Sequence, residues 1–131
     1  ITAHLARPVT TQPPLTEEEK AALMAAARED IPRRVAQFAH QVGVSVGRVT
    51  IRCQHTRWGS CSSKGNLNFN CLLMLCPPWV RDYVVIHELC HRREMNHSPR
   101  FWALVAEHCP DYDAARKWLK TQGRAIMERV Y

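Results

Sequence analysis

Three histidines and a glutamate stand close together near the middle of the chain, as His87-Glu88-Leu89-Cys90-His91 followed by His97. On an α-helix, residues four apart lie on the same face, so His87 and His91 would direct both imidazoles at one point. Such a pair suits a tetrahedral zinc ion, which at a catalytic site keeps one position open for water. Glu88 would lie roughly 100° around the helix from His87, near enough to reach that water without being a ligand. The motif predicts one zinc ion per chain, with a carboxylate beside it.

The third ligand of such a site has two candidates. His97 follows His91 by six residues, past a break that lets the chain turn back, whereas Glu107 falls on the next predicted helix. Spacing alone does not choose between them. Cys90, inside the motif, is interpreted as a small apolar filler, because a fourth protein ligand would close the position that catalysis needs.

Length and composition set the frame for this site. A chain of 131 residues forms a single domain, and its 46% apolar and 23% charged residues are ordinary for a globular protein. The net charge of +6 fits a solvated basic surface, an acidic substrate or nucleic acid. No apolar run approaches 18 residues, so no membrane span is expected. The six cysteines have irregular spacing without a Cys-x-x-Cys pair, which favours mostly reduced, buried cysteines and a cytoplasmic protein.

The elements that position the motif follow from periodicity. Residues 1–15 contain three prolines and read as an extended, poorly anchored arm, ahead of a domain at 16–131. Thr16 and Glu19 form a capping box for a helix that reaches Gly43, and Pro32 either kinks that helix or opens a second one. Alternation at 49–53 and 67–71 predicts two antiparallel strands joined through a turn at 59–65. Residues 79–94 form the motif helix, apolar on two sides and therefore central. Two short helices follow at 98–108 and 111–121, and Trp102 and Trp118 are interpreted as core residues.

The second half of the chain resembles the YgjP-like metallopeptidase domain, a zincin family related in pattern to SprT-like proteases. The stretch from Thr56 to Lys120 carries the matching segments in the right order. These segments are RWGSCS at 57–62, NLN at 66–68, PP at 77–78, VVIHELCH at 84–91, NHSPRFW at 96–102, CPDY at 109–112 and WLK at 118–120.

The resemblance implies an α+β fold, in which a short antiparallel or mixed sheet packs on a central helix with flanking helices. It implies His87, His91 and His97 as zinc ligands and Glu88 as the catalytic base. His97 is thereby preferred over Glu107, the position a gluzincin would use. The expected reaction is hydrolysis of a peptide bond in an extended polypeptide, which would add to an exposed edge strand of the sheet, here assigned to Leu67–Cys71.

Several features stay open at this level. Arg57 and Tyr112 are both candidates to stabilise the oxyanion, and Arg57 or Ser60 could border the cleft. Trp58 would anchor the core, while Gly59 would supply a tight turn. The alternatives to a general peptidase are a DNA-associated protease of the SprT-like kind, supported only by net charge, and a non-catalytic zinc domain. The arm at 1–15 could also lie along the cleft and keep the enzyme latent.

Overall fold

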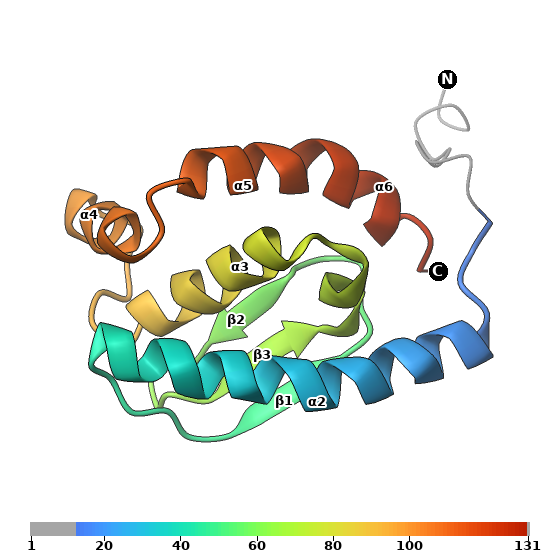
Figure 1. The fold of residues 1–131 in the computed structure, drawn as a ribbon, viewed down its shortest axis with the longest axis horizontal. Coiled ribbons are helices and arrows are strands. Elements are labelled where there is room, and N and C mark those ends of the chain that lie inside the picture. Colours follow the sequence, from blue (N-terminus) through green and yellow to red (C-terminus); the bar gives the residue numbers. More distant parts are fainter. Residues whose placement is uncertain (1–12, 131) are drawn as a thin grey trace.

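The computed structural model describes residues 13–130, in which a three-stranded sheet packs against helices (Figure 1). The predicted α+β class is confirmed. In chain order the elements are α2 (Glu17–Val42), β1 (Val49–Arg52), β2 (Gly59–Cys61), β3 (Leu67–Asn70), the 3-10 helix η1 (Cys71–Leu75), α3 (Pro78–Cys90), α4 (Pro99–His108), α5 (Tyr112–Trp118), the π-helical turn η2 (Leu119–Gly123) and α6 (Arg124–Met127).

The long helix α2 begins at the predicted capping box. The Glu19 amide donates to the Thr16 hydroxyl at 3.0 Å, and the Thr16 amide donates to the Glu19 carboxylate at 2.9 Å. Pro32 lies inside one continuous helix and opens no second one. The helix ends at Gly43, whose φ of 78° lies in the left-handed region that favours glycine. Its buried stripe, which includes Ile31 and Val35, covers the sheet and α3.

The sheet is mixed, with the strand order β1-β3-β2. β1 pairs with β3 in parallel and β2 pairs with β3 antiparallel, so the predicted antiparallel pairing of 49–53 with 67–71 is wrong. The predicted turn at 59–65 is wrong at its start, because residues 59–61 form β2. The sequence did not predict β2, which lies between β1 and β3 in the chain and runs in the opposite direction to both. The edge-strand assignment also fails, because β3 is the central strand and β2 is the edge beside α3.

Parallel pairing also explains a disulfide that the sequence did not predict. Arg52 and Asn70 are register partners, so the next residues, Cys53 and Cys71, lie opposite each other with Cα atoms 5.4 Å apart and are joined by a disulfide. The expectation of mostly reduced cysteines therefore does not extend to this pair. The other four cysteines are free, and Cys90 is buried in the core as the predicted apolar filler.

Helix α3 is the central helix of the domain, as predicted. It runs between α2 and the α5–α6 segment, with β2 beside it (Figure 1). Val80, Val84, Val85, Ile86 and Leu89 are all buried, so apolar side chains occupy both sides of the helix.

The two ends of the described chain meet. The Leu15 amide donates to the Arg129 carbonyl at 2.8 Å, and the Arg129 guanidinium donates to the Pro13 carbonyl at 3.0 Å. Leu15 is buried, so the last residue of the predicted arm is anchored in the core. Residues 1–12 of that arm lie outside the described residues. Within 13–130, no helix is long and apolar enough to cross a bilayer.

Candidate metal centre

Helix α3 and the turn that follows it bring three histidines together. His87 lies on the last turn of the helix and His91 caps its C-terminus. The chain then turns back to His97, which stands just before α4, where the Ser98 hydroxyl accepts a hydrogen bond from the Phe101 amide at 3.3 Å. The Nε2 atom of His97 lies 3.1 Å from Nε2 of His91 and 3.3 Å from Nε2 of His87.

These distances fit a metal ion. Nitrogen ligands at about 2.0–2.1 Å from a tetrahedral zinc stand roughly 3.3 Å from each other. One ring nitrogen from each of His87, His91 and His97 lies within 4.8 Å of the others, and no other His, Cys, Asp or Glu among residues 13–130 joins the group. A fourth position is therefore left to water or substrate.

Burial favours the neutral, metal-binding form of two of the three histidines, His87 and His91. Burial, followed by repulsion from His91 and His97, lowers the pKa of His87 to about 3. Burial also lowers the pKa of His91, although its hydrogen bond to the Glu94 carbonyl acts in the opposite direction. The neutral rings of His87 and His91, with the third imidazole of His97 beside them, suit a cation between them.

Hydrogen bonds on the far side of two rings orient the ligand nitrogens. His91 Nδ1 donates to the Glu94 carbonyl oxygen at 3.0 Å, which leaves its Nε2 free for a metal. His87 Nδ1 lies 3.0 Å from the Tyr83 hydroxyl, the same type of contact one helical turn upstream. Sequence reasoning missed Tyr83, although its position four residues before His87 was a usable signal.

Helix α4 supplies an aromatic support behind the cluster. Phe101 stacks on His91 with ring centroids 4.3 Å apart and meets His87 edge-on at 4.9 Å. Trp102 stacks on His97 at 5.8 Å and is covered by the Arg116 guanidinium at 4.4 Å. Both Trp102 and Trp118 are half-buried against the core, in line with their predicted packing role.

Glu88 borders the same cleft as the three histidines. The cleft measures about 250 Å³ and lies between α3 and β2, and its lining residues are Gly59, Ser60, Cys61, His87, Glu88, His91, Met95 and His97. Glu88 is only 6% exposed, and burial raises its pKa to about 8, partly opposed by the charge of Arg57.

Gly59 permits the close approach of β2 to Glu88. A Cβ at this position would lie 3.2 Å from Cγ of Glu88 and 3.2 Å from the carbonyl oxygen of Asn68. Gly59 thus begins β2 rather than forming the predicted tight turn. The sequence predicted that either Arg57 or Ser60 borders the cleft, and the structure places Ser60 there.

The remaining candidates lie away from the cleft. Glu107 is exposed, its carboxylate lies 3.3 Å from Nε2 of His108, and it borders a different cavity together with Arg93 and Arg100. Tyr112 stacks on Trp102 and does not line the cleft. Arg57 is exposed and acts on Glu88 only through its charge.

Comparison with known proteins agrees with this geometry. The family model for the YgjP-like metallopeptidase domain matches residues 6–122. The chain belongs to this family. It is therefore a metallopeptidase domain whose substrates are polypeptides, and the three-histidine cluster is its metal site.

Two solved structures share the fold of this YgjP-like domain. The metallopeptidase zymogen jannalysin of Methanocaldococcus jannaschii is 18% identical, with a TM-score of 0.62 over 71% of this chain and 96% of that one. The metallopeptidase zymogen abylysin of Pyrococcus abyssi is 22% identical, with a TM-score of 0.57 over 70% of this chain and 95% of that one. No curated protein sequence matches this chain.

Proposed function

We propose that this YgjP-like domain is a zinc-dependent peptidase, in which His87, His91 and His97 hold the metal and Glu88 is the general base. The observation that supports this most directly is the convergence of the three Nε2 atoms, at 3.1 and 3.3 Å, in one cleft with a buried carboxylate. Zinc in such a site lowers the pKa of water and polarises a carbonyl.

The carboxylate of Glu88 would take the proton of the attacking water and pass it to the leaving amine. Burial alone keeps this group protonated at neutral pH, because its pKa is about 8. A divalent cation held by the adjacent histidines favours the ionised form, which is the form a base requires. The opposing effects of burial and cation set the basicity of Glu88.

The extended substrate would pair with β2, which replaces the strand assigned from the sequence. One edge of β2 is taken by β3, while Ser60 and Cys61 line the metal cleft from the same strand. Main-chain hydrogen bonds to a free strand edge bind a peptide with broad sequence tolerance.

The variant Glu88→Gln tests the role of the base. It should retain one metal ion per chain and lose roughly 10²- to 10⁴-fold in kcat on an unstructured peptide. Glu107→Gln is the matched control, because it makes the same change at an exposed glutamate outside the cleft, and it should keep wild-type activity. Full activity in Glu88→Gln would refute the assignment.

Three further predictions differ in their support. Association with nucleic acid rests on the net charge of +6, and a gel shift at low salt tests it. The cytoplasmic location now rests on the four free cysteines alone, since Cys53 and Cys71 are paired.

Both solved structures that share the fold are described as zymogens, which favours the hypothesis that the arm at 1–15 keeps the enzyme latent. A chain beginning at Pro13, which keeps the buried Leu15, should then hydrolyse peptides faster than the full chain.

A further inference from the structure

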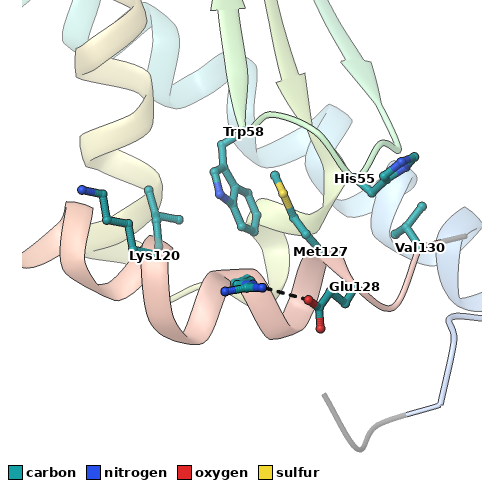
Figure 2. A pocket seen from close by; sticks show the side chains of 8 residues that line it. His55, Trp58, Lys120, Met127, Glu128 and Val130 are labelled. Atoms are coloured by element: carbon teal, nitrogen blue, oxygen red, sulfur yellow. Dashed lines mark ion pairs between the residues drawn. The ribbon is translucent and has the colours of Figure 1, made fainter. Parts of the chain in front are cut away.

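The C-terminal segment of the domain carries a cavity larger than the metal cleft. This C-terminal pocket has a volume of about 680 Å³, and Figure 2 shows the side chains around it. Its apolar lining comes from Trp58, Leu119, Met127 and Val130. Among the described residues, none lines both this pocket and the metal cleft, so the pocket is treated as a surface of its own.

The indole of Trp58 has a fixed position in the C-terminal pocket. It points toward the α5–α6 segment, between Lys120 on one side and Met127 on the other (Figure 2). A Cβ at Gly123 would lie 2.9 Å from Cζ2 of Trp58, so the ring packs directly on the π-helical turn η2. The indole is nonetheless only half-buried. Its remaining apolar surface is stabilised when another apolar group covers it.

The described chain begins at the rim of the C-terminal pocket. Arg129 stands between Glu128 and Val130, which both line the pocket. The Arg129 guanidinium donates to the Pro13 carbonyl at 3.0 Å, and this hydrogen bond holds the chain at that point. Residues 1–12 therefore join the domain beside the pocket.

The segment 1–12 has the length and the side chains to enter the pocket. Two of its apolar residues, Leu5 and Val9, are four apart and would share one face of an extended chain. An extended chain covers about 3.3 Å per residue, so Val9 and Leu5 lie within roughly 13 and 26 Å of Pro13. Both side chains can therefore reach a pocket whose rim meets Pro13.

The family comparison indicates that most of this segment belongs to the domain. The YgjP-like model matches from residue 6 onward. Residues 6–12 are thus part of the unit that the family shares. A segment of the domain that begins beside an exposed apolar pocket is expected to pack on the domain rather than to leave it.

From these observations we propose that the C-terminal pocket is the docking site of this chain's own residues 1–12, with Leu5 and Val9 on the indole of Trp58. The pocket is then an intramolecular interface that covers the apolar surface of the C-terminal segment. Docking needs neither metal nor substrate, so it goes beyond the proposed peptidase function and does not depend on it. The effect of the arm on hydrolysis is a separate measurement.

The test uses the full chain with ¹⁵N-labelled tryptophan and follows the indole resonances by NMR in one metal state. In the double variant Leu5→Asp/Val9→Asp, the Trp58 resonance should move away from its wild-type position, because carboxylates do not enter an apolar pocket. The matched double variant Ala6→Asp/Thr10→Asp adds the same charge on the opposite face of an extended segment. It should leave the Trp58 resonance unchanged.

Two further readings use the same proteins. Wild type should show nuclear Overhauser contacts from the Trp58 indole to the methyl groups of Leu5 and Val9. A synthetic peptide of residues 1–12, added to Leu5→Asp/Val9→Asp, should return the Trp58 resonance toward its wild-type position. Because a short tether gives an effective concentration of the order of mM, the Kd of this peptide should lie below about 1 mM. The Trp102 resonance, at the metal site, should stay the same throughout.

The outcomes separate the occupants. Equal Trp58 resonances in wild type and Leu5→Asp/Val9→Asp, equal shifts in the two double variants, or no response to the peptide would overturn the docking. A wild-type Trp58 resonance that changes with protein concentration, together with a dimer in light scattering, would overturn it in favour of docking on a second copy. None of these results bears on the peptidase function, because no substrate is used.

Discussion

The metal cluster and the cleft wall opposite it are built in different ways. The three histidines come from 11 consecutive residues, 87–97, and are positioned by one helix end and one turn. The opposite wall is β2, and Trp58, the residue before this strand, packs on the π-helical turn at Leu119–Gly123, about half the domain away in sequence. The ligand set is local, whereas the cleft that gives it a substrate is a product of tertiary packing.

Asn70 illustrates the tertiary part. Its side chain is fully buried, donates to the Gln54 and Arg57 carbonyls at 2.7 and 3.1 Å, and accepts from the Leu72 amide at 3.0 Å. One side chain thus holds the loop that leads into β2 and starts η1. We therefore expect changes near the histidines to alter metal binding, and changes at β2 to alter turnover with the metal retained.

The largest expected effect concerns the stability of the metal-free protein. The pKa of Glu88 is raised from 4.5 to about 8 by burial, so its neutral form is favoured in the folded state. The stability that the neutral Glu88 side chain contributes to the folded state is fully present below pH 4.5 and is lost as the pH rises toward 8. In chelator-treated protein, the free energy of unfolding of wild type should fall by roughly 3 to 5 kcal/mol relative to that of Glu88→Gln across this pH window. Denaturant unfolding measures the difference, and parallel curves would contradict the assigned environment of Glu88.

A smaller effect is expected on the ligand side, at Tyr83. Loss of its hydroxyl removes the partner of His87 Nδ1, so Tyr83→Phe should weaken metal affinity by about 10- to 100-fold. Competition with a fluorescent chelator measures the affinity. Tyr112→Phe is the matched control, because Tyr112 stacks on Trp102 and contacts no ligand through its hydroxyl in the described structure. Equal affinities in both variants would remove Tyr83 from the site.

In the wall of the cleft formed by β2, the variant Gly59→Ala should lower kcat by about tenfold and leave the metal bound. The added Cβ would meet Cγ of Glu88 at 3.2 Å and displace the base slightly. Gly43→Ala is a useful contrast, since it strains a left-handed residue with no neighbour within 4 Å and should cost about 1 kcal/mol of stability without changing kcat. If Gly59→Ala loses metal instead, the separation between the two regions fails.

The sequence was sufficient to predict the features that depend on residues close to one another along the chain. The capping box at Thr16 and the face shared by His87 and His91 follow from helical spacing, and the structure has both. The sequence also placed Cys90 correctly, since a small apolar residue on the inner side of a central helix packs into the core.

The main errors concern pairing across the chain, while the predicted helices at 79–94 and 111–121 differ only at their ends, Cys90 and Met127. Nothing local in Gly59-Ser60-Cys61 indicates a strand, because three small residues show no alternation. Without β2, the strands at 49–53 and 67–71 look like a hairpin, and the parallel register that joins Cys53 to Cys71 cannot be foreseen. The substrate edge was then assigned to β3, which the structure places at the centre of the sheet.

The central claim is that three histidines, and no glutamate, hold one zinc ion. Elemental analysis after dialysis against trace zinc tests it most directly, on wild type, His97→Ala and Glu107→Ala. We expect about one zinc per chain in wild type and in Glu107→Ala, and a loss of most of the metal in His97→Ala, while circular dichroism shows that all three remain folded. Zinc retained in His97→Ala and lost in Glu107→Ala would contradict the account.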